Sequence, residues 1–136
     1  NVYAASCGGG KFMAVLQFRK ATIADEGRQR QAALLAFSAF PELKHVFLVD
    51  DDVDPFDMSD VLWAMTTRYQ GNLDTVFLPG VRGHVLDPTQ SPLYDARIHA
   101  RGVGCKTIFD CTVPFDQKER FQRAPFMEVD PGKFLI

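Results

Sequence analysis

The sequence predicts an α/β domain with a mostly parallel sheet, flanking helices, a long irregular loop and an extended C-terminal tail. Three observations lead to this fold class. Short apolar runs rich in β-branched and aromatic residues recur along the chain, as expected for strands covered on both faces. Stretches with apolar residues at helical spacing separate these runs, which implies right-handed crossovers between parallel strands. The 136 residues, 46% of them hydrophobic and 24% charged, suffice for one domain with its own core.

The first 18 residues predict two strands joined by a glycine-rich turn. Residues 2–5 (VYAA) form a short strand and residues 12–18 (FMAVLQF) a stronger one, with Gly8–Gly10 between them. A phosphate-binding loop needs a helix directly after the glycines and a complete GxxxxGK[ST] or GxGxxG pattern. Neither is present, so we interpret the glycines as a hairpin turn or loop, and Lys11 as solvent-exposed.

A helix is expected after the polar residues 19–30, and Pro41 ends it. Small and apolar residues at helical spacing predict the face through which this helix packs. They are Ala32, Leu35, Ala36, Ala39 and Phe40.

The central stretch, residues 45–68, reads as a buried strand, an acidic corner and a helix in direct succession. The strand is VFLV, and Asp50–Asp52 end it. Asp57 is expected to be the helix N-cap, with Asp60 three residues later in a pattern close to a capping box. Gly71 and Asn72 are expected to close this helix. Its predicted apolar face contains Met58, Val61, Leu62, Met65 and Tyr69.

The remaining residues predict two more strands around an irregular segment. Residues 74–78 (DTVFL) and 106–111 (KTIFDC) read as strands. Residues 79–104 between them are rich in proline and glycine and show no sustained period, and long loops of this kind are often functional or contact another domain. The tail is rich in phenylalanine, and its prolines prevent one long helix. We expect it to wrap over a neighbouring surface, and a pure oligomerisation module that uses this tail as its contact is an alternative interpretation of the chain.

Composition excludes several classes of protein. The net charge of −2 gives no electrostatic footprint for nucleic acid. No apolar run reaches the roughly 18 residues of a membrane span, and the first residues do not read as a signal peptide. An odd number of cysteines without zinc-site spacing predicts reduced thiols and a cytoplasmic protein. The cysteines are Cys7, Cys105 and Cys111, and the last two are expected to be buried and inert.

The acidic corner permits several interpretations. A calcium loop of the EF-hand type fails, because Pro55 and Val61 occupy the positions that require Gly and Glu. A haloacid dehalogenase-type phosphatase matches only loosely. A glycosyltransferase-type Asp-x-Asp, which holds a divalent metal, is satisfied literally by Asp50 and Asp52. Alternatively, these aspartates cap backbone amides and pair with a nearby Arg or Lys.

Histidine is the other candidate for chemistry. His84 lies in the irregular segment, where an imidazole can orient or protonate a substrate or can simply be a surface side chain. His45 and His99 are assigned no function.

Four separated blocks resemble one protein family. LKHVFLVDDDVDPFDMSDVLWAMTTR, DTVFLPGVRGHVLDP, KTIFDCTVPF and KERFQRAPF are similar to the carboxy-terminal domain of UbiD-type decarboxylases, most of all to the gallate and protocatechuate branch. The similarity runs from about Gly8 to the end of the chain.

The resemblance implies that residues 1–136 form a single domain at the C-terminal end of a larger decarboxylase. Such enzymes use prenylated FMN, with manganese and potassium ions, to decarboxylate aromatic or unsaturated acids without oxidation. Their amino-terminal and middle regions hold the cofactor, the metal ions and a Glu-Arg-Glu catalytic set. None of those motifs occurs in this sequence, so no catalytic, cofactor-binding or metal-binding residue is assigned here. The expected partners are a phenolic acid substrate, the rest of the enzyme and further copies of it, without nucleic acid or membrane.

Two substrate-binding residues follow from the resemblance, His84 and Leu86. In the family, two alternate side chains of this segment enter the substrate pocket, and alternate residues of an extended segment share a face. His84 would bond a ring hydroxyl or assist proton transfer, while Leu86 packs on the ring. A lysine that contacts the cofactor phosphate in some members has no counterpart near Ser38. The corner from Asp50 to Asp60 then becomes architecture that directs the chain toward the loop carrying His84.

Overall fold

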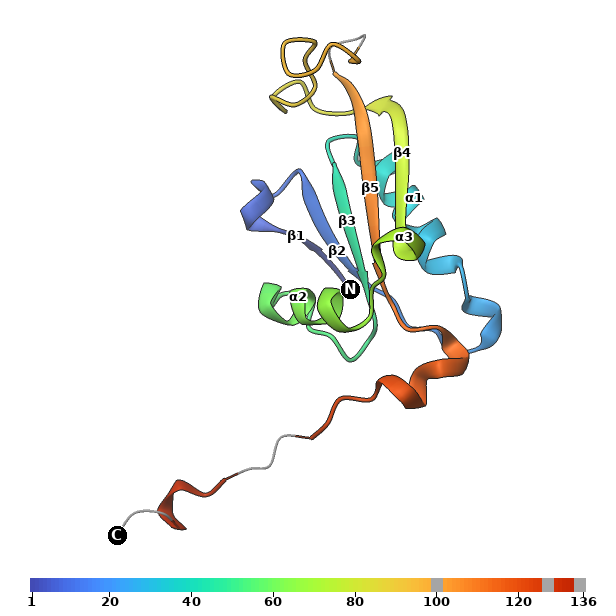
Figure 1. The fold of residues 1–136 in the computed structure, drawn as a ribbon, viewed down its shortest axis with the longest axis vertical. Coiled ribbons are helices and arrows are strands. Elements are labelled where there is room, and N and C mark those ends of the chain that lie inside the picture. The colour runs from blue at the N-terminus through green and yellow to red at the C-terminus, as the bar shows by residue number, and fades with distance from the viewer. Residues whose placement is uncertain (99–101, 126–128, 134–136) are drawn as a thin grey trace.

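The computed structural model describes residues 1–98, 102–125 and 129–133. Its centre is a five-stranded sheet in the order β1-β2-β3-β5-β4 (Figure 1). The strands are Val2–Ala4 (β1), Met13–Gln17 (β2), His45–Val49 (β3), Thr75–Arg82 (β4) and Val103–Cys111 (β5). β2, β3 and β5 are parallel, while β1 and β4 pair antiparallel at the two edges. The predicted α/β class with flanking helices is therefore confirmed, and the sheet is mixed.

The direction of β4 differs from the expected parallel arrangement. The helices are Arg28–Ala39 (α1), Met58–Thr67 (α2) and the single turn Gly71–Asp74 (α3). Figure 1 shows α2 lying across the end of the sheet at which β3 finishes. Because α2 does not return the chain to the other end, β4 starts at the end of the sheet where β3 finishes and runs antiparallel to β5. β4 also continues to Arg82 and β5 begins at Val103, so the irregular segment is shorter than predicted.

Alternating side chains of β3 divide the core between the two faces of the sheet. Val46 and Leu48 join the cluster beneath α1, where Ala33 and Phe37 are buried. Phe47 and Val49 belong to the second cluster, which contains residues of α2. A helix on each face explains why this strand is apolar at every position and not only at alternate ones.

The packing faces of the helices were predicted only in part. In α1, the buried residues are Gln29, Ala33 and Phe37, whereas Leu35 is 70% exposed. Alanines lie on both sides of this helix, so its composition does not distinguish the inner face. Of the face predicted for α2, Met58, Val61 and Met65 pack in the core, as does Tyr69 beyond the end of the helix, but Leu62 is exposed.

The boundaries of α2 show one confirmed prediction and one error. Asp57 is the N-cap and accepts a hydrogen bond from the Ser59 N–H at 2.9 Å. The helix ends at Thr67, and Gly71 begins α3 instead of closing α2. The early residues follow the prediction, since β1 and β2 form an antiparallel hairpin in which Gly9 and Gly10 adopt positive φ angles.

Short 3-10 helices complete the fold. They are Ser6–Gly8 (η1), Ile23–Asp25 (η2), Phe115–Phe121 (η3) and Pro131–Lys133 (η4). Among the described residues, no helix is long and apolar enough to cross a membrane. Two phenylalanines of the tail, Phe126 and Phe134, and His99 lie outside the described residues.

The three cysteines carry free thiols. Burial raises the pKa of the Cys111 thiol to about 12, which agrees with an inert residue. Cys105 is exposed, so the prediction that it is buried was wrong. The difference arises because β5 starts earlier than predicted and carries Cys105 beside the irregular segment.

We expect Leu48→Ala to lower the free energy of unfolding by about 2–4 kcal/mol, because it leaves a cavity beneath α1. Leu35→Ala is the matched control, since its side chain is exposed, and should change stability by less than about 0.5 kcal/mol. Urea unfolding measures both values. A larger loss for Leu35→Ala would contradict the observed orientation of α1.

Candidate functional site

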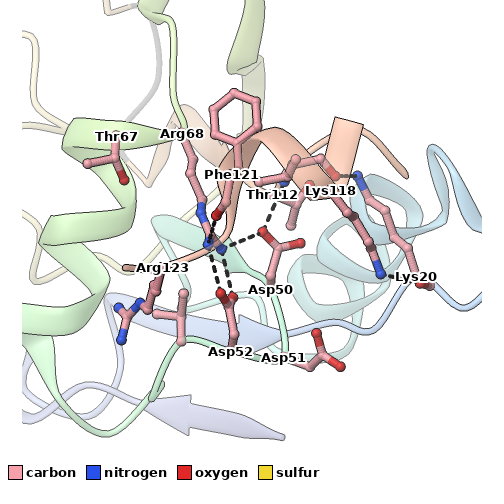
Figure 2. Close-up of polar contacts among 12 residues, drawn as sticks. Lys20, Asp50, Asp51, Asp52, Thr67, Arg68, Thr112, Lys118, Phe121 and Arg123 are labelled. Carbon is pink, nitrogen blue, oxygen red and sulfur yellow. Dashed lines mark hydrogen bonds and ion pairs between the residues drawn. The ribbon is translucent and has the colours of Figure 1, made fainter. Parts of the chain in front are cut away.

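The acidic corner closes around one buried guanidinium. Arg68 follows α2, and its side chain is 3% exposed. Its Nη1 donates to Asp50 Oδ2 at 2.9 Å and to Asp52 Oδ1 at 2.7 Å, while Nη2 donates to Asp52 Oδ2 at 2.7 Å. Figure 2 shows the guanidinium reaching between the two carboxylates. Two bonds to Asp52 form the bidentate arrangement that arginine favours.

The same group ties the start of the tail to the corner. Arg68 Nη2 also donates to the Phe121 carbonyl at 2.9 Å, and Asp50 Oδ2 accepts from the Val113 N–H at 3.0 Å (Figure 2). Arg123 lies 3.8 Å from the centroid of the Trp63 ring. The beginning of the tail therefore packs on the domain's own corner.

These contacts decide between the interpretations of the corner. Arg68 nitrogens bind Asp50 Oδ2 and both carboxylate oxygens of Asp52, which a metal held by Asp-x-Asp would need, and Asp51 lies 3.7 Å from Arg19. Within the described ranges, no group of three or more His, Cys, Asp or Glu side chains is placed to hold a metal ion. The structure thus supports pairing with arginine and gives the Asp-x-Asp metal interpretation no support.

The environment shifts the two carboxylates in opposite directions. Burial raises the pKa of Asp50 above its ordinary value, although Val113 N–H and Arg68 oppose this effect. The hydrogen bonds from Arg68 lower the pKa of Asp52. Asp52 therefore stays ionised to a lower pH than Asp50 does.

His84 lies at the other end of the sheet from the acidic corner. Its ring meets Phe12, the residue before β2, edge-on at a centroid distance of 5.9 Å. Nε2 lies 3.4 Å from Glu42 Oε1, and Nδ1 accepts the Leu86 N–H at 3.2 Å. Phe12 and Glu42 precede parallel strands whereas Asp50 follows one, so the corner does not direct the chain straight to His84. The chain first crosses the sheet through β4.

The segment around His84 is a turn and not an extended strand. The Asp87 N–H donates to the His84 carbonyl at 3.0 Å. The two predicted substrate-binding side chains therefore do not share the face of an extended segment: the His84 side chain is 17% exposed, whereas Leu86 is 73% exposed. The bond between them joins the Leu86 backbone N–H, and not the Leu86 side chain, to the imidazole.

Neighbouring residues hold this turn in place. The buried Asp87 carboxylate lies 2.8 Å from Lys44 Nζ and accepts from the Thr89 N–H at 2.9 Å. A Cβ on Gly83 would lie 1.9 Å from Gln90 Nε2, so only glycine fits there without movement of the glutamine. The backbone that carries His84 is thus held in place by the contacts of Asp87 and by the close packing of Gly83 against Gln90.

A cavity also lies at each end of the sheet. One of about 740 Å³ adjoins the acidic corner and is lined by Lys20, Arg30, Asp110 and Arg68 among others. The other, of about 780 Å³, is lined by Lys44, His45, Tyr94 and Cys105 among others, next to the turn. Sequence reasoning missed Arg68 and Glu42 as partners, because each lies many residues from the group it contacts.

Comparison with known proteins identifies the family. Residues 1–111 match the model of the 3-octaprenyl-4-hydroxybenzoate carboxy-lyase C-terminal domain, so the chain belongs to this UbiD-type family. Gallate decarboxylase of Lactiplantibacillus plantarum is 57% identical over 99% of this chain and 28% of its own length. The apo structure of 3,4-dihydroxybenzoic acid decarboxylase from Enterobacter cloacae is 60% identical, with a TM-score of 0.89 over 98% of this chain and 27% of that one.

A more distant structure carries a cofactor. An evolved dimeric form of the UbiD-class enzyme from Pelotomaculum thermopropionicum, in complex with prenylated FMN, is 25% identical with a TM-score of 0.70. The alignment covers 99% of this chain and 26% of that enzyme. The chain therefore spans a little over a quarter of the length of these three relatives, and it shares its fold with the two solved structures.

We expect Arg68→Leu to lower the free energy of unfolding by about 3–5 kcal/mol, because it leaves Asp50 buried without its cation. Arg97→Leu is the matched control: Arg97 also pairs with an aspartate, but its side chain is 89% exposed, so solvent screens the pair and the loss should be much smaller. Urea unfolding of both variants compares them. Equal losses would show that the corner contributes no more than a surface ion pair.

The opposite pKa shifts predict opposite pH dependences. The pKa of Asp52 is lowered in the folded state, so its ionised form stabilises the fold above pH 3.8 and this contribution is lost as the pH falls below that value. The stability deficit of Asp52→Asn should therefore shrink in acid. The pKa of Asp50 is raised, so wild type should lose stability relative to Asp50→Asn as the pH rises above 3.8. Urea unfolding between about pH 3 and pH 7 tests both slopes, and slopes of equal sign would contradict the assignment.

Proposed function

We propose that the chain is the carboxy-terminal domain of a prenylated-FMN-dependent decarboxylase of phenolic acids such as gallate or protocatechuate. The observation that carries this proposal is identity of 57% and 60% to a gallate and a 3,4-dihydroxybenzoic acid decarboxylase over nearly the whole chain. A relative with a different activity is less similar. An anhydromevalonate phosphate decarboxylase of Methanosarcina mazei is 39% identical over 82% of this chain.

In this proposal the chain supplies part of the substrate pocket and contacts between subunits. The cofactor, with manganese and potassium ions, would be held outside these residues and would supply the bond-breaking chemistry. The chain alone would then be inactive, and the whole enzyme a cytoplasmic homo-oligomer. The acidic corner has no catalytic part in this scheme, because its carboxylates are bound by Arg68.

His84 and Leu86 are the proposed substrate-binding residues. Because His84 Nδ1 accepts the Leu86 N–H, the neutral imidazole carries its proton on Nε2, a donor suited to a phenolic oxygen. The Leu86 side chain is apolar and 73% exposed, so it offers a surface for an aromatic ring. Both side chains belong to one supported turn, which suits a pocket wall.

In the full-length enzyme, we expect His84→Ala to lower kcat/KM for gallate or protocatechuate by at least about tenfold, the scale of one lost orienting or acid–base group. Leu93→Ala is the control, because Leu93 lies in the same irregular segment with its side chain 98% exposed. Steady-state release of carbon dioxide measures both, and the 136-residue chain with added cofactor is the negative control. Wild-type kinetics for His84→Ala would exclude the role of this residue.

A further inference from the structure

The His84 imidazole contacts Glu42, which lies in the connection between α1 and β3. We propose that Glu42 is a positioning residue, whose carboxylate orients His84 and keeps a proton on Nε2. This inference rests on the proposed function, because it concerns the side chain that is proposed to meet the substrate. Glu42 itself is not proposed to react.

Three contacts surround the imidazole. Phe12 packs edge-on against the ring, and the Leu86 N–H donates to Nδ1 at 3.2 Å. Nε2 lies 3.4 Å from Glu42 Oε1. Since Nδ1 acts as an acceptor, the N–H of the neutral ring is on Nε2 and faces the carboxylate. Moving the proton to Nδ1 would place N–H against N–H at Leu86 and would remove the donor that faces Glu42.

Glu42 is itself placed by a second charge. Its Oε2 lies 3.8 Å from Lys11 Nζ, so the carboxylate lies between a lysine and the imidazole. Lys11 precedes β2, Glu42 precedes β3 and His84 follows β4. The three residues come together because the ends of these strands meet at one end of the sheet (Figure 1).

The long contact with Glu42 leaves the Nε2 proton able to bond a substrate oxygen as well. A separation of 3.4 Å is long for an N–H···O bond, so the contact with Glu42 does not saturate the Nε2 proton. Bonds of catalytic groups are often long without substrate and shorten in the complex. A phenolic oxygen can therefore share this proton while Glu42 holds the ring. Because Nδ1 is bonded to the Leu86 backbone, the same restraint fixes His84 relative to Leu86.

The first test measures the imidazole itself. In the ¹⁵N-labelled 136-residue chain, Glu42→Leu should speed exchange of the His84 Nε2 proton with water by about tenfold or more, and weaken the magnetisation transfer between His84 and Phe12. Glu42→Gln keeps an acceptor oxygen and should restore most of both signals. Glu119→Leu, the same change at an exposed carboxylate of η3, is the control. Unchanged exchange and transfer in Glu42→Leu would overturn the inference.

The second test measures turnover in the full-length enzyme. Glu42→Leu should lower kcat/KM for protocatechuate by about tenfold, with recovery in Glu42→Gln and none of this loss in Glu119→Leu. If His84→Ala slows turnover while Glu42→Leu leaves both the imidazole signals and turnover unchanged, the positioning inference fails and the proposed function stands. If Glu42→Leu alters the imidazole but His84→Ala turns over normally, the positioning contact stands and the pocket role of His84 fails.

Discussion

The buried guanidinium of Arg68 constrains the carboxyl ends of the central strands. A charge removed from water is tolerated only when it is closely paired, so the fold must bring carboxylates to it. Asp50 and Asp52 do so directly after β3, and the Phe121 carbonyl adds an acceptor from the tail. One side chain thereby holds together the end of a strand, the end of α2 and the segment after β5 (Figure 2). Two of the three successive aspartates, Asp50 and Asp52, therefore belong to that junction, whereas Asp51 lies beside Arg19.

The sheet separates this junction from the region with proposed function. The parallel strands β2, β3 and β5 run from the end of the sheet that carries Phe12 and Glu42 to the end that carries Asp50. β3 is buried on both faces, beneath α1 and beside α2, so packed core lies between the two ends. A rigid core of this kind lets the turn after β4 hold its side chains while the opposite end carries the buried charges.

Local signals explain which parts of the fold were predictable. The run VFLV and the N-cap Asp57 depend on neighbouring residues, and both predictions were correct. The direction of β4 depends on how α2 crosses the sheet, and the inner face of α1 depends on Phe37 meeting strands far away in the chain. Both depend on contacts between residues far apart in the chain, which cannot be inferred from composition or from the spacing of apolar residues. The partners of Asp50 and His84 were missed for the same reason, since Arg68 and Glu42 are marked by no motif.

A domain to which no catalytic residue is assigned can still determine which carboxylic acid an enzyme accepts as its substrate. A site that hydrogen-bonds a substrate hydroxyl rejects an analogue without that group far more strongly than an apolar pocket rejects a small change in size. Such discrimination requires a donor whose direction is fixed before the substrate arrives, because a freely rotating group adapts to either ligand. In the proposed function His84 is that donor. Its ring is restrained through Nδ1 by the Leu86 backbone and through Nε2 by Glu42, so the specificity of the enzyme would depend on a turn supported by Asp87 and Gly83.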